Sequence, residues 1–432
     1  MANEPYGFQL TAPEYLAEPA TATLRVREVD FREDPRWLQF ISQHPDALIY
    51  HHPTWLSALE SEYRGKCIAL ACEDADGEIQ GILPLLYTRG LPIRISRHQV
   101  GRRLSSLPRT PLAGPLATSN LAAASLVKAA IDYVRNEPGL RLELKTTIPD
   151  LDKLVDGLQC IRWRDTYVRG LPDNRNRDVA CKHAGTHETR TCAPCDTCRL
   201  FSFGNSRDNH QVKWAVNKAV KHGLSMRIAE TEDELRAWYR MYLDVMRRNV
   251  VPPRPYRLFQ RLWREMRSQG HMILVLAERN EERPGVSPVL SEPGAQETLA
   301  NPEYGSIVGG SILLSFGDTV FWSFTGTEKG RSGHHSNDLT LWHCMHESCK
   351  QGYDWFDLGE VAENHPELSQ FKAKWGTIQR PMYRYYYPAR TEREEEEAPA
   401  SVNRVSQFAR SVWQKLPLDV TAVLGDWILS CL

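Results

Sequence analysis

The sequence predicts an α/β protein built from two domains in tandem. Two long stretches alternate short apolar runs, typical of strands, with amphipathic helical patterns, and a segment without apolar periodicity separates them. The chain has 432 residues, enough for two or three domains that each bury a core. We expect these segments: a flexible leader at 1–22, a first domain at 23–171, an insertion or linker at 172–210, a second domain at 211–388, and an acidic spacer with an apolar C-terminal helix at 389–432.

Composition places few limits on function. The formal net charge is −1 and a quarter of the residues are charged, so overall charge indicates neither a nucleic-acid nor a membrane partner. The N-terminal residues show no basic region followed by an apolar stretch, and no run of about 18 apolar residues occurs. Ten cysteines without a secretion signal favour reduced thiols. We therefore expect a cytoplasmic protein.

The first domain begins with helical patterns and continues with strands. Tryptophan and aliphatic residues recur at helical spacing in two short segments, and two apolar runs joined by Asp-Ala-Asp-Gly predict a hairpin. The expected elements are helices around 37–41 and 54–63, strands at 67–72 and 81–87, a long loop at 94–116, a helix at 121–134, and strands at 140–145 and 160–167.

The second domain has the clearer pattern. Thr231 with Glu234 three residues later is a capping-box signature, and prolines at 252 and 253 end the helix that follows. The expected elements are a strand at 224–229, two helices up to Gly270, strands at 272–277, 307–314 and 319–324, a helix at 337–350, a strand at 355–358, a short helix at 366–375 and a last strand at 383–387. A polar excursion at 279–304 interrupts the sheet. This order is that of an acetyltransferase fold.

The C-terminal tail follows an acidic run at 392–397 and carries apolar residues from Val412 to Leu429. It is too short and too interrupted to span a membrane. Docking on the body of the protein and contact with a membrane surface are both open. The tail lacks the Lys/Arg face that interfacial helices usually have, which favours docking.

A family resemblance rests on motifs spread over about 300 residues. Trp214–Pro388 resembles the FemAB-related, BioF-like (CelD-like) acetyltransferases of the GNAT superfamily, and 52–55 with 81–85 look like a matching N-terminal half. The motifs that carry the resemblance are 214–219, 222–224, 246–249, 252–256, 337–338, 357–360 and 371–376.

The resemblance implies two tandem GNAT-like (acyl-CoA N-acyltransferase-like) domains, with mixed twisted sheets flanked by helices. It also implies transfer of an acyl group from acyl-CoA or another activated donor to a primary amine of a cell-envelope sugar or peptidoglycan-type acceptor. Where the wider superfamily has a Gln/Arg-x-x-Gly-x-Gly/Ala loop, this sequence has Lys329-Gly330-Arg331-Ser332-Gly333-His334.

Acyl transfer to an amine needs a group that accepts a proton and donors for the oxyanion. Glu360 lies with Asp357 at the end of an expected strand, and we predict that it is the general base. His334 and Asp338, at the start of the central helix, complete the predicted catalytic set, because a histidine titrates near neutral pH. The alternative is that Asp-Leu-Gly-Glu only turns the chain and that His334 is a solvated loop residue.

The predicted substrate-binding residues are cations, amides and aromatic side chains near this strand end. Lys372 is the favoured phosphate or carboxylate contact, since only one of the two lysines that precede Trp375, Lys372 and Lys374, can face the cleft. The full set is Lys372, Lys374, Trp375, Asn337, Arg247, Arg248, Asn249, Tyr256 and Lys218. For each of them a structural role is the alternative: capping a helix, packing, or covering a solvated helix face.

The segment 172–210 contains a cysteine pattern. Cys192, Cys195 and Cys198, with Cys181, His183 or His187 as a fourth ligand, form a candidate structural zinc site. Free thiols in a flexible loop are the favoured interpretation, and structural zinc is the alternative.

Three functions remain open at this stage. The first is an N-acyltransferase in the cytoplasm or at the inner face of the membrane, with peripheral contact through the tail. The second is a Fem-type transferase that uses aminoacyl-tRNA to build peptidoglycan bridges. The third is a non-catalytic scaffold of an exopolysaccharide synthesis system.

Overall fold

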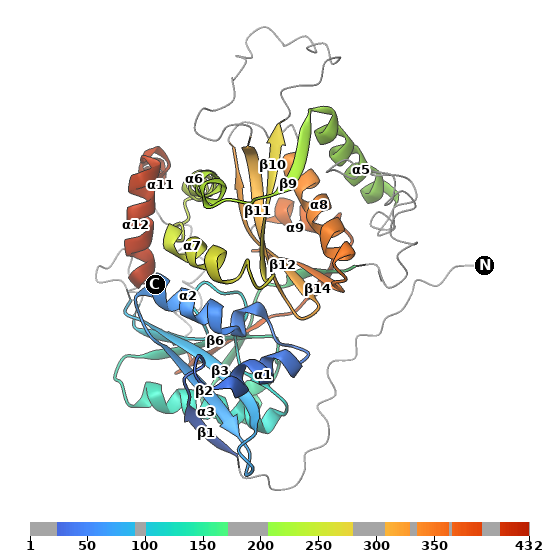
Figure 1. The fold of residues 1–432 in the computed structure, drawn as a ribbon. Helices are drawn as coiled ribbons and strands as arrows, with labels where there is room; N and C mark the ends of the chain where they lie inside the picture. The colour runs from blue at the N-terminus through green and yellow to red at the C-terminus, as the bar shows by residue number, and fades with distance from the viewer. Residues whose placement is uncertain are drawn as a thin grey trace, which may run out of the picture.

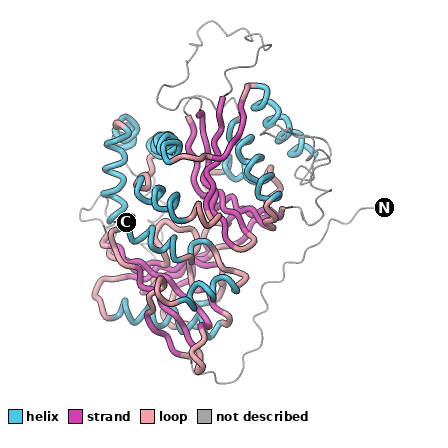
Figure 2. The backbone as a smooth tube through the Cα atoms, in the orientation of Figure 1, coloured by secondary structure: helices cyan, strands magenta, loops and turns pink. Residues whose placement is uncertain are grey.

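The protein folds into two mixed sheets, each flanked by helices (Figures 1 and 2). This confirms the fold class expected from the sequence. The computed structural model describes residues 24–90, 101–171, 206–279, 307–328, 335–362, 365–390 and 407–431.

The first sheet has the strand order β1-β2-β3-β4-β6-β15-β7, with β5 paired to β3. Its strands are β1 (Arg25–Glu28), β2 (Cys67–Glu73), β3 (Ile79–Thr88), β4 (Arg103–Ser105), β5 (Leu116–Ala117), β6 (Arg141–Thr146), β7 (Gln159–Arg162) and β15 (Tyr383–Tyr387). The helical elements around it are α1 (Pro35–Gln43), η1 (Ile49–His51), α2 (Pro53–Tyr63), α3 (Asn120–Arg135) and α4 (Leu151–Leu154). The two short strands β4 and β5 lie in the stretch expected to be a long loop.

The second sheet has the order β14-β8-β13-β12-β11-β10-β9. Its strands are β8 (Thr166–Gly170), β9 (Leu224–Ile228), β10 (Met272–Arg279), β11 (Ile307–Phe316), β12 (Thr319–Thr327), β13 (Trp355–Glu360) and β14 (Ile378–Arg380). The helices that flank it are α5 (Ser206–Lys221), α6 (Glu232–Arg248), α7 (Tyr256–Glu265), α8 (Ser336–Lys350) and α9 (Pro366–Ala373). Helix α5 begins inside the segment expected to be an insertion.

The two sheets exchange strands. Residues 160–167, expected to form one strand, form two: β7 pairs in the first sheet and β8 in the second. The last strand, β15, occurs where expected but lies between β6 and β7 in the first sheet. The two crossing segments run side by side, and the Trp163 amide donates to the Met382 carbonyl at 2.8 Å.

The cores follow this arrangement. One cluster joins the first half to the α6–α7 face of the second sheet and contains Trp37, Trp55, Trp238 and Phe259. A second cluster lies between the opposite face and helices α5 and α8, and a third packs α3 onto the first sheet. Because one core includes residues from both halves, their apolar surfaces are buried together.

Helix α6 shows how the local sequence positions these layers. The Thr231–Glu234 capping box occurs as expected and starts the helix. Gly310 and Gly326 are paired between β11 and β12, and Trp238 lies over them and donates from Nε1 to the Gly310 carbonyl at 3.0 Å. The absence of side chains at both glycines lets the helix approach the sheet closely.

The tail forms α11 (Gln407–Lys415) and α12 (Leu418–Cys431), and α12 packs against α6 and α2. The docking expected for the tail is therefore observed. Among the described residues, no helix is both long and apolar enough to cross a bilayer.

Candidate functional site

The candidate site is a fork in the second sheet. The parallel strands β12 and β13 pair only from Thr319–Phe321 to Trp355–Asp357. Beyond Phe321, β12 continues to Thr327 with no strand partner on that side among the described residues. An unpaired strand edge offers backbone donors and acceptors to an extended ligand. The end of β13, with Asp357 and Glu360, forms the other arm of the fork.

The arm formed by β13 is shaped by a local irregularity. Its register with β8 shifts between Asp357 and Glu360, and Gly359 has a φ of +79°, which glycine adopts without strain. Oδ1 of Asp357 accepts from the Gly359 amide at 2.6 Å and from the Thr166 hydroxyl at 2.7 Å. Burial raises the pKa of Asp357, although these hydrogen bonds and nearby cations oppose the shift. Asp357 is thus a carboxyl group that takes up a proton more readily than usual.

Glu360 faces the segment that crosses between the sheets. Oε2 of Glu360 accepts from the Trp163 indole N–H at 3.0 Å, and the Arg164 guanidinium lies 3.6 Å from Oε1. The side chain is partly exposed. A held, accessible carboxylate at the end of a strand has the chemistry required of a general base.

Lys372 reaches the same strand end as Glu360, but its amine is engaged. Nζ donates to the backbone carbonyls of Leu358, Gly359 and Glu360 at 2.5, 3.0 and 3.2 Å. The side chain is buried, and burial lowers the pKa of its amine to about 8, against the opposing effect of Asp357 and Glu360. The sequence predicts that Lys372 contacts a substrate anion. In the structure the amine instead supports the backbone that presents Glu360.

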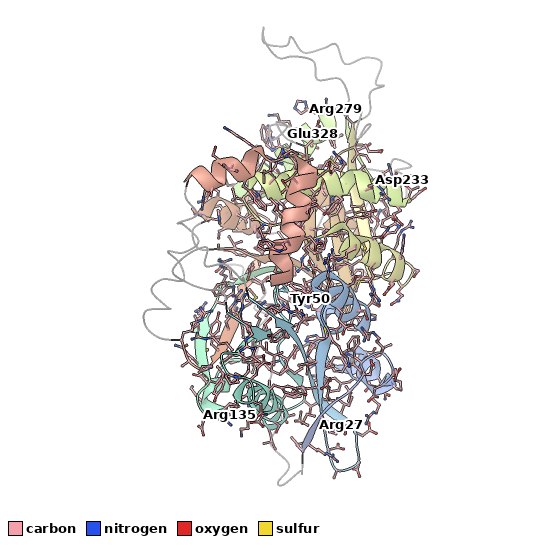
Figure 3. The ribbon with its side chains drawn as sticks, turned by 90° about the vertical axis from the view of Figure 1, so that its left-hand side faces the viewer. Arg27, Tyr50, Arg135, Asp233, Arg279 and Glu328 are labelled. Carbon is pink, nitrogen blue, oxygen red and sulfur yellow. The ribbon has the colours of Figure 1, made fainter. Side chains whose placement is uncertain are left out.

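Tyr50 enters the fork from the first half of the chain. Figure 3 places it at the level where the two halves meet. Its buried ring packs against Phe321 with centroids 5.3 Å apart, and Ser323 is a hydrogen-bonding neighbour of the phenol. Burial, with the negative charge of Asp357, raises the pKa of Tyr50. Its hydroxyl therefore keeps its proton at neutral pH and can act as a donor.

The start of α8 lies near a group of cations. His335 occupies the N-cap position with a φ of 54° and makes no side-chain cap, so neither Ser336 nor Asn337 caps the helix; Asn337 is exposed. The buried Asp338 is 2.5 Å from Nζ of Lys374 and 3.5 Å from Nδ1 of His335. Asp338 is therefore paired and is not presented to the fork. His334 and the loop before it lie outside the described residues.

Helix α5 adds an aromatic and basic surface beside this helix start. The Trp214 ring, half exposed, meets the His335 ring edge-on with centroids 4.9 Å apart. Nζ of Lys218 lies 4.7 Å from the centre of the Trp214 ring. A helix N-terminus beside a lysine and an exposed indole suits a phosphate group with an attached aromatic base.

The cations at the end of α6 hold the tail and the sheet. Arg247 donates to the Leu416 carbonyl at 2.8 Å and pairs with Asp244. Arg248 pairs with Asp244 and donates to the Thr327 carbonyl at 3.1 Å, while Asn249 is the exposed C-terminal residue that ends the helix. The structure assigns each arginine a structural partner.

Two predicted aromatic contacts pack in the body of the protein. The Tyr256 ring lies 5.2 Å from that of Tyr239, and its hydroxyl contacts Glu232 at 3.4 Å. Trp375 is fully buried in the core between the sheet and α8.

No group of three or more potential metal ligands occurs in the part of the chain that the structure describes. The candidate zinc ligands Cys192, Cys195 and Cys198 lie outside that part.

Comparisons with known proteins agree with this geometry. Residues 298–372, which contain β11, β12, α8, β13 and most of α9, match the model of the acetyltransferase (GNAT) domain. The structure is similar to that of FemX, with a TM-score of 0.55 and 14% identity, over 86% of this chain and 99% of FemX. It is also similar to the C-terminal domain of a putative lysylphosphatidylglycerol synthetase from Agrobacterium fabrum, with a TM-score of 0.50 and 12% identity, over 85% and 95% of the two chains. No curated protein matches the sequence.

These findings define the class. The chain has a GNAT-type acyltransferase fold shared with FemX, and the matched segment includes the fork. The narrower BioF-like resemblance stays a prediction.

The residues that the first half of the chain contributes to the site were not among those predicted from the sequence. Tyr50, Trp163 and Thr166 reach the fork because β8 belongs to the second sheet and η1 lies beside it. A signal was present: Arg164-Asp165 is a charged interruption in the segment 160–167, which was expected to form one strand.

Proposed function

We propose that the protein transfers an acyl group from acyl-CoA, or a similar activated donor, to a primary amine at the fork between β12 and β13. The proposal rests on one observation: two parallel strands of a GNAT-type sheet separate beside a carboxylate. The acceptor we propose is a cell-envelope sugar or peptidoglycan-type amine, met in the cytoplasm at the inner face of the membrane.

Each arm of the fork has its own task in this proposal. The open edge of β12 holds the extended part of the donor by backbone hydrogen bonds, and the start of α8 with Lys218 holds its phosphates. Glu360 removes a proton from the attacking amine, because only the neutral amine has the lone pair that forms the new bond to carbon. The hydroxyl of Tyr50 donates to the negative charge that develops as the acyl group leaves its donor.

The remaining predicted residues take supporting roles. Lys372 fixes the carbonyls of 358–360 and so positions Glu360, and Lys374 pairs with Asp338 to hold α9 against the start of α8. We propose that His334 transfers a proton in the reaction, as its sequence pattern indicates. For the cysteines at 192, 195 and 198, free thiols stay the favoured interpretation and structural zinc the alternative.

Ligand binding tests the donor. In a thermal-shift panel of acetyl-CoA, longer acyl-CoAs and nucleotide sugars, we expect at least one acyl-CoA to raise the melting temperature, because a ligand bound only by the folded state stabilises it. Binding of charged tRNA with a steep salt dependence, and of no acyl-CoA, would instead select the Fem-type alternative.

Turnover tests the base. With an amine acceptor identified by acyl-CoA consumption, Glu360→Gln should lower kcat by roughly 10²–10⁴-fold. The matched control is Glu367→Gln, on the exposed side of α9. If both variants retain the wild-type rate, Glu360 is not the base. If the wild type consumes no acyl-CoA with any amine and Glu360→Gln leaves function in cells unchanged, the scaffold alternative replaces the enzyme.

A further inference from the structure

Helix α12 is fixed to the body of the protein through one face. Leu429 and Thr421 are buried, and Gly425 lies so close to Pro253 that an added Cβ would meet its ring at 2.5 Å. Asp426 accepts from Arg257 at 2.6 and 2.7 Å and pairs with Arg64 at 3.2 Å. The orientation of the helix is therefore set by packing and by charge.

The opposite face of α12 is apolar and exposed. Val420, Val423, Leu424 and Trp427 follow one another at spacings of three, one and three residues, which places them on one stripe. Val423 is 70% exposed and Trp427 is 46% exposed. A docked helix normally turns its apolar side inward, so an outward apolar stripe indicates a surface that another apolar phase covers. Figure 1 shows α11 and α12 at the outer edge of the molecule, and Figure 3 turns that edge toward the viewer.

Cations lie at both ends of this stripe. Arg64, 71% exposed, pairs with Asp426 near its C-terminal end, and the exposed Lys66 follows Arg64 by two residues. The exposed Lys415 precedes its N-terminal end. Asp419, at the start of α12, is exposed and lies 3.6 Å from Arg240. An apolar stripe with a tryptophan, between cations, matches the hydrocarbon and the anionic headgroups of a lipid surface.

We propose that this stripe binds the surface of a membrane that contains anionic lipids, with α12 lying in the plane of the interface while its other face stays docked. The inference is independent of the acyl-transfer chemistry. It also gives the bound protein a fixed orientation, because Arg247 ties the end of α11 to α6 and Arg248 ties α6 to the end of β12.

Vesicle flotation of the full chain tests the proposal. The probes are vesicles of phosphatidylcholine alone and vesicles with about 30% phosphatidylglycerol. We expect the wild type to float with the anionic vesicles, and binding to fall as salt is raised to about 0.5 M. Val423→Ser with Trp427→Ser should reduce binding about tenfold or more, because binding scales with the apolar area buried. The matched control is Leu38→Ser with Leu121→Ser, two apolar side chains 44% and 43% exposed on other helices.

The outcomes separate lipid from other occupants. Failure of the wild type to float, or equal flotation of the stripe variant and the wild type, overturns the proposal. Light scattering tests the remaining occupant, a second copy of the chain. If the wild type is a dimer that does not bind vesicles, and the stripe variant is a monomer, the face is a dimer interface and the membrane proposal is overturned. Neither flotation nor light scattering depends on acyl-CoA. Failure of the membrane proposal therefore leaves the proposed acyl transfer untouched, and failure of acyl transfer leaves the membrane proposal untouched.

Discussion

Arg254 and Glu62 form a buried ion pair that joins the two halves of the chain. Nη1 of Arg254 is 2.6 Å from Oε2 of Glu62, and the two side chains are 3% and 0% exposed. Nη2 of Arg254 also donates to the Arg109 carbonyl at 2.5 Å. The pair connects the segment before α7 to the end of α2, in the core shared by both halves.

Removing one member of this pair should be far more harmful than removing both. Glu62→Ala leaves the Arg254 guanidinium buried without its carboxylate, and we expect a loss of about 3–5 kcal/mol in the free energy of unfolding. The double variant Glu62→Leu, Arg254→Met should lose much less. Urea unfolding of the three proteins checks this. Equal losses in the single and double variants would show that shape alone matters at this position.

Lys372 should make stability depend on pH in an alkaline window. Burial lowers the pKa of its amine to about 8 in the folded chain, from an ordinary value of 10.5. Between these values the unfolded chain binds more protons, so the free energy of unfolding rises with pH, by up to about 1.4 kcal/mol per unit. Burial also lowers the pKa of the Lys145 amine to about 8, so Lys145 makes the free energy of unfolding rise with pH in the same window.

The free energy of unfolding, measured between pH 7.5 and 10 for the wild type and for Lys372→Met, checks this slope. The rise is expected in the window of about 8 to 10.5. The variant should show a smaller rise than the wild type. If the curves for the two proteins are parallel, burial does not lower the pKa of the Lys372 amine.

Gly326 should tolerate no side chain. A Cβ there would lie 2.8 Å from the Tyr242 amide and 3.1 Å from Nε1 of Trp238, which forces α6 away from the sheet. We expect Gly326→Ala to cost about 1–3 kcal/mol. Gly101→Ala is the control, because nothing lies within 4 Å of the added atom. Thermal unfolding distinguishes the two, and a wild-type melting temperature for Gly326→Ala would contradict the close packing.

Lys218 should strengthen donor binding under the proposed function. Lys218→Ala removes a cation beside the start of α8, so the dissociation constant for acyl-CoA should rise roughly three- to tenfold and its salt dependence should weaken. Lys128→Ala, an exposed lysine on α3, is the control. Calorimetric titration at two salt concentrations measures both effects. An unchanged dissociation constant would place the phosphates elsewhere.

The sequence allowed prediction of the elements that local patterns encode. The Thr231–Glu234 cap, the strands β10 to β13 and the helix α8 occur within a few residues of the expected bounds, because each has its own periodicity or cap. It also allowed Glu360 and Lys372 to be placed at one strand end.

Partner choice between strands was not predictable in this way. Strands β8 and β15 have only five residues each, and nothing local decides which sheet a short strand joins. The burial of Lys372 and the position of Tyr50 beside β12 depend on that choice. Their roles therefore cannot be read from the local sequence.

The strand exchange has a consequence for synthesis of the chain. The first sheet has β15 in its interior, between β6 and β7, yet β15 is translated only after the whole second sheet. Until β15 has been synthesised, the edges of β6 and β7 that pair with it are unpaired, and their backbone groups are exposed to other chains. The first sheet therefore cannot be completed until the strands of the second sheet have been synthesised.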